Sequence, residues 1–192
     1  TANVPELVPY LAFAVPRVPL SLTSIQILAV DLGTDMLPAL GLGAEAPDSR
    51  VMQRPPRSRR DRLLTPGLLV RAYLFLGVLE AAAAMAAFFF VLAPAGWQLG
   101  QDLPISDVLY RKATTACLTA IVLMQVVTVH LCRSRRRSVL SRPLFNNSLI
   151  TAGIVAEIAL ILAIDYTVPG NAVFGTAPLG YEVWLAILPL AL

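Results

Sequence analysis

The sequence predicts an all-α protein, a polytopic bundle of transmembrane helices in which one helix is interrupted. Hydrophobic residues make up 57% of the 192 residues and charged residues only 14%, whereas a soluble domain carries about 25% charged residues. The mean hydropathy of +0.71 agrees with this composition. Apolar runs of about 20 residues, the length that crosses a bilayer, recur along the chain with basic stretches between them.

The first two apolar segments are separated by a proline-rich break. The segment Val4 to Val15 is too short to cross a membrane alone, so we expect it to be the end of a longer helix. Pro16 to Pro19 then break the helix, because proline has no backbone N–H to donate. The second span, Ser21 to Leu42, contains Gly33 and Pro38, and both residues weaken a helix. We therefore expect this span to be interrupted.

The rest of the chain holds three further spans and the start of another apolar element. These cover Leu68 to Leu92, Val108 to Cys132, Ser148 to Ile164 and Leu179 to Leu192. The Pro- and Gly-rich segment Tyr166 to Pro178 is predicted to be a loop. Cys117 and Cys132 lie about 22 Å apart on one helix, which is too far for a disulfide. We expect both to be free thiols.

The basic residues indicate how the spans are oriented. Eleven of the 15 Lys and Arg residues lie in two stretches, Arg50 to Arg62 and Arg133 to Arg142, which follow the second and fourth spans. Alternating spans place both stretches on one side of the membrane, and the positive-inside rule makes that side cytoplasmic. Neither stretch carries the interleaved aromatic residues that stack on bases, so no nucleic-acid partner is expected.

Two acids lie within the second span. Asp31 and Asp35 are four residues apart and would share one face of an intact helix. An acid at the centre of a bilayer costs about 2.5–3.5 kcal/mol on insertion scales, so its presence favours a binding role. Thr34 and the carbonyls freed by the interruption add further oxygen ligands, which suit Na⁺, K⁺ or Ca²⁺. The interrupted span is thus predicted to be an ion-binding helix.

Other polar residues lie within the remaining apolar segments. Asn3 and Glu6 flank Pro5 and could face the same cavity. Further candidates are Glu80, Gln125, Thr128 and Glu157. Each acid could instead pair with a neighbouring helix, and the two uncharged side chains could form hydrogen bonds between helices.

Several motifs resemble those of one family of membrane proteins. The run Leu22 to Glu45, with Asp-Leu-Gly-Thr-Asp at Asp31 to Asp35, resembles the sixth transmembrane helix of the type II P-type cation-transporting ATPases. Met52 to Arg57 resembles the cytoplasmic loop that follows it. Asn3 to Glu6 resembles the middle of the fifth helix, and Cys132 to Ser138 resembles the basic exit of the eighth.

The resemblance covers the whole chain and divides it into helices five to ten of that family. It assigns residues 1–18 to the end of helix five, 21–42 to helix six, 43–67 to a cytoplasmic loop, 68–92 to helix seven, 108–132 to helix eight, 146–165 to helix nine and 179–192 to helix ten. It implies an integral protein of the plasma membrane with cytoplasmic Arg-rich loops. Its implied partners are the lipid bilayer and a missing N-terminal part of the same polypeptide, and an accessory subunit is left open.

The resemblance also implies a function. In this family, ATP phosphorylates an aspartate in a cytoplasmic domain, and the pump alternates between inward-facing and outward-facing states. The phosphorylation and nucleotide domains are absent from this sequence, so ATP and Mg²⁺ would act only in the full-length protein and no catalytic residue is expected here. The implied cation ligands are Asn3, Glu6, Asp31, Thr34 and Asp35, with Glu6, Asp31 and Asp35 as the metal-binding carboxylates and Gln125, Thr128 and Glu157 as additional candidates.

The transported cation is left open among Na⁺, K⁺ and Ca²⁺. Asp31 and Glu157 resemble the sodium/potassium and proton/potassium branch, whereas Thr128 stands where the sodium/potassium pump has an acid. Two other classes remain. A secondary transporter or channel could also use a broken helix as an ion site, and an assembly subunit would have no transport role.

Overall fold

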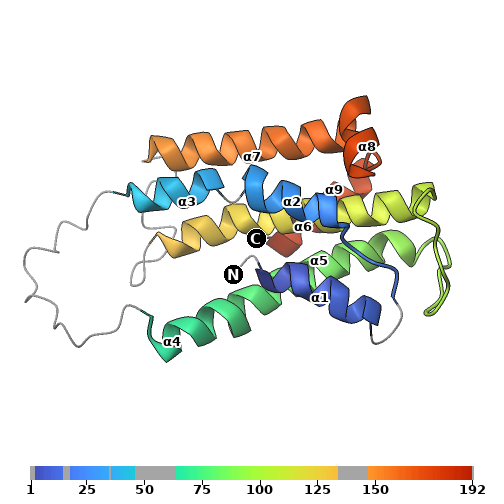
Figure 1. Ribbon diagram of the computed structural model, residues 1–192, viewed down its shortest axis with the longest axis horizontal. Helices are drawn as coiled ribbons and strands as arrows, with labels where there is room; N and C mark the ends of the chain where they lie inside the picture. Colours follow the sequence, from blue (N-terminus) through green and yellow to red (C-terminus); the bar gives the residue numbers. More distant parts are fainter. Residues whose placement is uncertain (1–2, 15–17, 35, 46–63, 134–146, 192) are drawn as a thin grey trace, which may run out of the picture.

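The chain forms a bundle of helices, shown by a computed structural model that describes residues 3–14, 18–34, 36–45, 64–133 and 147–191. No strand occurs within these ranges (Figure 1). Among the described residues, four helical runs are long and apolar enough to cross a membrane: Ser24–Gly43, Pro66–Leu92, Val108–Cys132 and Ser148–Tyr166. The predicted polytopic helical bundle is thereby confirmed.

The second predicted span is interrupted where its sequence indicated. It consists of α2 (Ser24–Ala29), the π-helical stretch η1 (Val30–Thr34) and α3 (Met36–Gly43). The Thr34 hydroxyl donates a hydrogen bond of 2.8 Å to the Val30 carbonyl, and this bond competes with the backbone hydrogen bonds of the helix. Pro38 has no N–H for the Thr34 carbonyl four residues earlier. Asp35, which separates η1 from α3, lies outside the described residues.

The next span is one continuous helical run of three parts. These are α4 (Pro66–Leu69), the π-helical η3 (Val70–Leu76) and α5 (Gly77–Leu92). Thr65 caps the start, where its side chain accepts a hydrogen bond of 3.3 Å from Leu68 N, and Pro66 occupies the first turn. The η3 sequence contains neither Gly nor Pro. Because it holds no residue that weakens a helix, its π-helical conformation was not predicted.

The central helix of the bundle is α6 (Val108–Cys132), which packs against α5, α7 (Ser148–Tyr166) and α9 (Tyr181–Ala191). The main core cluster joins Phe88 of α5, Leu118 and Ile121 of α6, and Ile161 of α7. The first helix, α1 (Asn3–Ala14), lies along α5. There the Val4 side chain occupies the space above Gly77, where an added Cβ would lie 2.7 Å from Val4 Cγ2.

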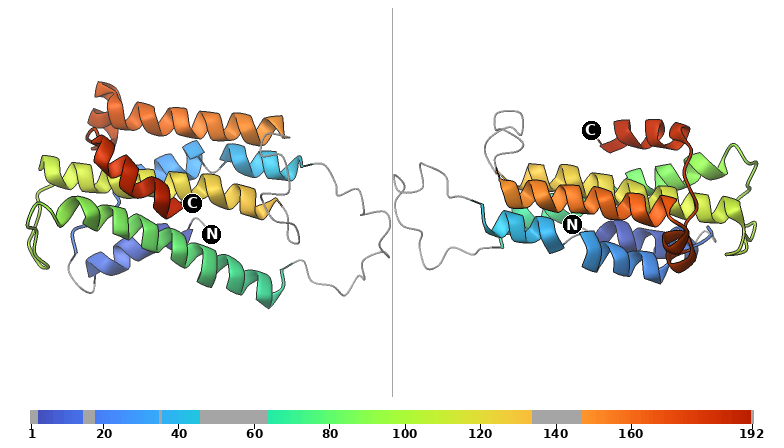
Figure 2. Two further views of the ribbon diagram at one scale, coloured as in Figure 1. Left: turned by 180° about the vertical axis from the view of Figure 1, so that it is seen from behind. Right: turned by 90° about the horizontal axis from the view of Figure 1, so that it is seen from above.

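The connected ends of the long spans gather at two opposite poles of the bundle, as alternating spans require, whereas the start of α1 and the end of α9 lie between the poles (Figure 2). At one pole, Arg133 after α6 forms an ion pair of 2.9 Å with Glu45 after α3, and Asn147 before α7 donates a hydrogen bond of 2.7 Å to Glu45. At the other pole, the Tyr110 hydroxyl donates a hydrogen bond of 2.8 Å to the Leu20 carbonyl. Apart from Arg133, the Arg-rich stretches lie outside the described residues.

The segment Tyr166 to Pro178, predicted to be a loop, contains the short helix α8 (Val168–Phe174). The Thr167 side chain caps α8 by accepting a hydrogen bond from Gly170 N, and Gly175 ends it with a left-handed φ of 65°. A Cβ at Gly170 would clash with the carbonyl oxygens of Ala163 and Ile164, so glycine allows α8 to fold back onto α7.

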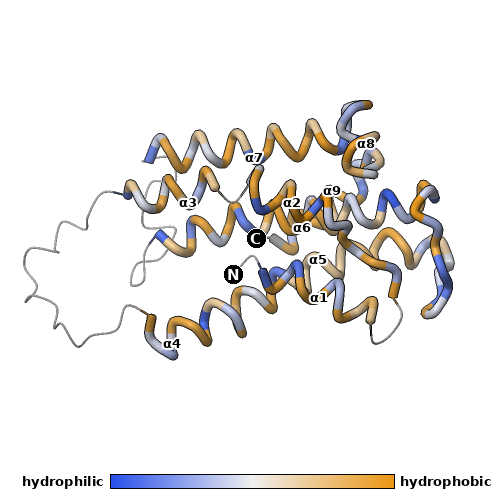
Figure 3. The backbone as a smooth tube through the Cα atoms, in the orientation of Figure 1, coloured by the Kyte–Doolittle hydropathy of each residue, from blue (hydrophilic) through white to orange (hydrophobic). Residues whose placement is uncertain are grey.

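Large apolar side chains remain exposed along the spans. Leu32, Leu74 and Val155 are 63%, 68% and 63% exposed, respectively. The spans are mostly hydrophobic along their length, and hydrophilic residues gather mainly toward the connections (Figure 3). A surface of this kind requires lipid or further protein to cover it.

Helix α3 approaches α7 closely at Gly41 but not at Gly43, which allows a paired test. A Cβ added at Gly41 would lie 2.9 Å from the backbone nitrogen of Ile150, whereas one added at Gly43 meets no atom within 4 Å. We expect Gly41→Ala to lower the free energy of unfolding in detergent by about 1–3 kcal/mol through overpacking. Gly43→Ala on the same helix should leave it unchanged or raise it by up to about 1 kcal/mol. Equal thermal stability of the two variants would contradict this close approach.

Candidate functional site

Polar side chains are buried midway along the bundle, where the spans are otherwise apolar. We call this set the central polar layer. It comprises Glu6 of α1, Thr34 of η1, Glu80 of α5, Gln125 and Thr128 of α6, and Glu157 of α7. Since each of these residues comes from an apolar helix, the layer brings oxygen-bearing side chains from five elements into the interior.

The interrupted helix joins this layer through Thr34. Its hydroxyl lies 3.1 Å from the side-chain oxygen of Gln125 and 2.8 Å from the Val30 carbonyl. Gln125 is 5% exposed, and its side-chain nitrogen has no hydrogen-bond partner among the described residues. The structure therefore brings together two of the residues that the sequence singled out.

A second contact in the layer joins α5 to α6. The Thr128 hydroxyl donates a hydrogen bond of 2.5 Å to the Glu80 carboxylate, and Glu80 is 1% exposed. Thr128 follows Gln125 by three residues, so the two side chains lie about one turn apart on neighbouring positions of the helix surface. Thr34, Gln125, Thr128 and Glu80 thus form a polar path from η1 to α5.

Glu157 lies on the face of α7 that contacts the interrupted helix. On either side of it, Gly153 faces Pro38, and Leu160 faces Gly33, where an added Cβ would lie 2.5 Å from Leu160 Cδ2. Glu157 is 1% exposed. Its position between these two contacts places it beside the junction of η1 and α3.

Two predicted ligands, Asn3 and Asp31, are exposed and do not join the layer. A third, Asp35, lies outside the described residues. Asp31 is flanked on its surface by Leu28 and Leu32, which are 54% and 63% exposed. An acid among exposed leucines on an apolar span does not resemble the water-facing surface of a soluble protein.

The layer supplies hard oxygen donors from carboxylates, hydroxyls and an amide. Such groups suit alkali and alkaline-earth cations better than soft metals. No group of three or more His, Cys, Asp or Glu side chains that could hold a metal occurs within the part of the chain that the structure describes. Cys117 and Cys132 are free thiols, as predicted.

One buried acid escaped the sequence reasoning. Asp165 is fully buried at the end of α7, and it accepts a hydrogen bond of 2.9 Å from the Thr119 hydroxyl of α6. It follows Glu157 by eight residues, a spacing that places both acids on one face of a helix. That periodicity could have identified Asp165, which instead fell at the boundary of the predicted span.

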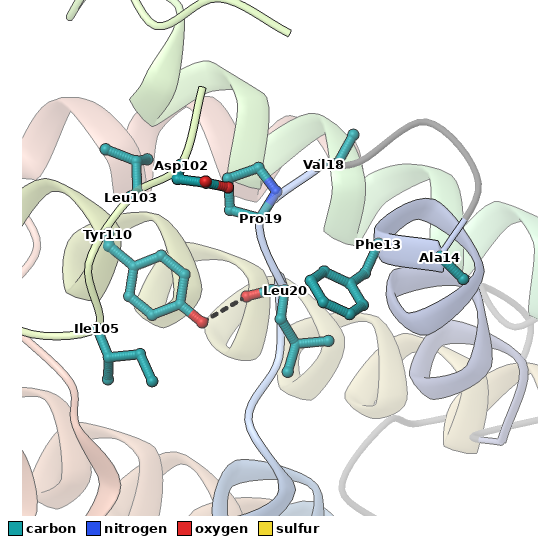
Figure 4. Close-up of a pocket in the computed structure, with 9 residues that line it drawn as sticks. All are labelled: Phe13, Ala14, Val18, Pro19, Leu20, Asp102, Leu103, Ile105 and Tyr110. Atoms are coloured by element: carbon teal, nitrogen blue, oxygen red, sulfur yellow. Dashed lines mark hydrogen bonds between the residues drawn. The ribbon is translucent and has the colours of Figure 1, made fainter. Parts of the chain in front are cut away.

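A separate cavity of about 650 Å³ lies at the pole where α1 and α2 connect (Figure 4). Its walls include Phe13, Leu20 and Ile105, and the Tyr110 side chain points into this region to reach the Leu20 carbonyl. It shares no residue with the central polar layer. The predicted ligands therefore do not belong to this cavity.

Comparison with known proteins gives a match along almost the whole chain. The family model described as "Cation transporting ATPase, C-terminus" matches residues 19–192. The sodium/potassium-transporting ATPase subunit alpha-1 of Catostomus commersonii is 32% identical over 217 residues, covering 100% of this chain and 21% of the relative. The potassium-transporting ATPase alpha chain 1 of Xenopus laevis is 30% identical over 217 residues, which again cover 100% of this chain and 21% of the relative.

A human relative gives a similar result. The sodium/potassium-transporting ATPase subunit alpha-3 of Homo sapiens is 31% identical over 214 residues, covering 98% of this chain and 21% of the relative. The chain therefore spans about one fifth of the length of these relatives.

Proposed function

Because the chain belongs to the family of cation-transporting ATPase C-termini, we propose that it supplies the membrane part of an ATP-driven P-type cation pump. The family match confirms the resemblance first drawn from Asp31 to Asp35. The two relatives from Catostomus and Xenopus carry the names of sodium/potassium and potassium pumps. ATP hydrolysis itself would take place in parts of the full-length protein that this sequence does not contain.

The observation that carries this proposal is the interruption of an apolar span next to a buried polar layer. The backbone hydrogen bonding of the second span becomes π-helical at η1, where the Thr34 hydroxyl lies 3.1 Å from the side-chain oxygen of Gln125 on α6. A transmembrane helix tolerates irregular backbone where it is buried in protein or lines a cavity. Half-helix ends and freed carbonyls at such a break are the groups that bind ions in other transporters.

The proposed ligands follow from the sequence and from the layer together. They are Asn3, Glu6, Asp31, Thr34 and Asp35, with Gln125, Thr128 and Glu157 as additional ligands. The exposed face around Asp31 would be covered by further helices of the full-length protein, since the relatives are about five times longer than this chain. The cation is Na⁺, K⁺ or Ca²⁺, and ATP and Mg²⁺ act elsewhere in the polypeptide.

The proposed orientation places the Glu45 and Arg133 pole in the cytoplasm, because the Arg-rich stretches adjoin it in the sequence. The plasma membrane is the proposed location. The lipid bilayer and the remaining part of the same polypeptide are the proposed partners.

The test is cation-dependent phosphorylation of the full-length protein in lipid. Phosphoenzyme formed from radiolabelled ATP is measured while Na⁺, K⁺ and Ca²⁺ are titrated separately. At least one cation should change the phosphoenzyme level, and Asp31→Asn should raise its half-maximal concentration about tenfold or more, as expected for the loss of a charged ligand. A protein that transports a cation without any phosphoenzyme would indicate a secondary transporter or channel instead.

A further inference from the structure

We propose that Asp165 of α7 is a proton-binding site outside the central polar layer. Its carboxylate takes a proton from a hydronium ion, which leaves a neutral carboxylic acid and a water molecule, and it returns the proton in the reverse step. The site lies at the end of α7 beside α8, near the pole away from Glu45 and Arg133 (Figure 1). This inference goes beyond the proposed function, because the proposed ligands do not include Asp165.

The Asp165 carboxylate is buried, and only one of its two oxygens has a hydrogen-bond partner. The side chain is 0% exposed, and Oδ2 accepts a hydrogen bond of 2.9 Å from the Thr119 hydroxyl of α6. The other oxygen, Oδ1, has no hydrogen-bond partner among the described residues. Buried polar atoms are usually satisfied. Oδ1 is therefore the atom that can receive a proton.

Among the described residues, no cationic side chain forms an ion pair with this carboxylate. Arg111 of α6 precedes Thr119 by eight residues, which is about 12 Å along the helix axis. Its guanidinium instead donates hydrogen bonds of 2.8 Å and 2.6 Å to the carbonyls of Asn171 and Thr176. An ionised carboxylate that is buried without a counter-charge is so costly that such a group takes up a proton instead.

The other titratable groups of the helices packed against α7 lie away from Asp165. Helices α3 and α8 carry none, and Asp31 of η1 is exposed. On α6, Lys112 is exposed near the start of the helix. Cys117 is two residues from Thr119, which places it about 200° around α6, and it packs in the apolar core.

The titratable groups of α7 itself and of α9 are also accounted for. Glu157 precedes the buried acid by eight residues, which is about 12 Å along the axis. The Tyr166 hydroxyl donates a hydrogen bond of 2.9 Å to the Leu179 carbonyl. Tyr181 and Glu182 of α9 are exposed. The proton that we propose therefore replaces a counter-charge that no neighbouring side chain supplies in the described part of the chain.

The ligand set at this position favours a proton over a metal cation. The contacts of the described residues bring one carboxylate and one hydroxyl together here. A calcium ion takes six to eight oxygen ligands, and Mg²⁺ takes six. A proton needs only one oxygen, so it fits a site in which Asp165 and Thr119 are both fully buried.

Polar groups connect this site with the nearby pole. Thr115 and Thr119 follow Arg111 at intervals of four residues on α6, and both threonines are fully buried. Beyond α8, the Thr176 hydroxyl donates a hydrogen bond of 2.7 Å to the carbonyl of the residue before Asp165. A hydroxyl both donates and accepts hydrogen bonds, so this region offers a proton a more favourable route than the apolar helix surfaces do.

The experiment is infrared difference spectroscopy of the full-length protein in lipid, with choline as the only added cation. Spectra are compared between about pH 9 and about pH 6, where buried carboxyls titrate and exposed ones stay ionised. We expect the carbonyl stretching band of a carboxylic acid to appear at the lower pH and to be lost in Asp165→Asn. Asp102→Asn, which makes the same change at an exposed position, is the matched control and should keep the band.

A second variant tests the hydrogen bond to the carboxyl group. In the protonated acid, Oδ2 is the carbonyl oxygen and still accepts from Thr119. Thr119→Val removes this donor, so the band should move to higher frequency, as for a carbonyl that loses a hydrogen bond. A band at the wild-type frequency in Thr119→Val would show that it does not come from Asp165 and would refute the proposal.

The remaining outcomes are equally decisive. The same pH-dependent band in the wild type and in Asp165→Asn would refute the proton site. Carboxylate bands of Asp165 that respond to added Na⁺, K⁺ or Ca²⁺ at constant pH, but not to pH, would indicate a metal site instead. If Asp165→Asn does not assemble, Asp165→Glu decides: the band should persist at a shifted frequency, and an unshifted band opposes the proposal. These measurements need no ATP, so a failure of the proposed function would leave them unaffected.

Discussion

Asp35→Asn in the full-length protein should abolish cation-activated phosphorylation. The substitution keeps the size of the side chain and removes its charge, so the transported cation loses a carboxylate within a medium of low dielectric constant. Removing one partner of a buried charge pair typically costs about 2–5 kcal/mol, which corresponds to an affinity loss on the order of 30-fold to several thousandfold. Phosphoenzyme measured against cation concentration gives this loss directly.

The matched control for this change is Asp102→Asn. Asp102 is exposed on the connection between α5 and α6, at the pole away from Glu45 and Arg133. The same chemical change there should leave cation activation at its wild-type value. If Asp35→Asn retained wild-type activation, the interrupted helix would not hold the cation, and the assembly-subunit hypothesis would gain support.

Arg133→Ala should cause the largest loss of stability among substitutions at the helix ends. The Arg133 side chain is only 6% exposed and Glu45 is 18% exposed, so the alanine variant leaves Glu45 without this ion pair in a sheltered place. Breaking a buried pair in this way costs up to about 3–5 kcal/mol. We expect about 3 kcal/mol, measured as the free energy of unfolding in detergent, because Asn147 still donates a hydrogen bond to Glu45.

Two further variants make this stability test specific. Arg71→Ala removes an exposed arginine near the same pole and should change the free energy of unfolding by less than about 0.5 kcal/mol. Combining Glu45→Gln with Arg133→Gln removes both charges and should restore part of the stability. A double variant less stable than either single variant would show that the pair acts through other contacts.

The spans were predictable because a bilayer imposes a simple length and composition on them. The interruption of the second span was predictable too, because Gly33 and Pro38 each weaken a helix through their own backbone chemistry. The π-helical stretch η3 was not, because no residue within it is a helix breaker. Helix α8 was also missed, since its cap at Thr167 and the docking of Gly170 onto α7 depend on contacts that a count of Pro and Gly does not reveal.

The candidate site was predictable only where the signal lay within one helix. The i, i+4 spacing of Asp31 and Asp35 could be read from the sequence, and their roles stay a prediction. The pairing of Thr34 with Gln125, and of Glu80 with Thr128, depends on which faces of separate helices meet. No local pattern determines that choice, so the sequence left Glu80 open between a functional role and a helix-packing role.

The two halves of the interrupted helix are anchored to different neighbours. The α2 half contacts the α8 region through Gln26, whose side-chain nitrogen donates a hydrogen bond of 3.1 Å to the Phe174 carbonyl. The α3 half is seated backbone to backbone against α7 at Gly41 and Gly153. Any change in the angle between the halves must therefore be absorbed between Gln26 and Pro38, the segment that contains the π-helical stretch η1. Bending there would move the Asp31 side chain relative to the Thr34 hydroxyl. The positions of these oxygen donors would therefore change whenever the angle between α2 and α3 changes.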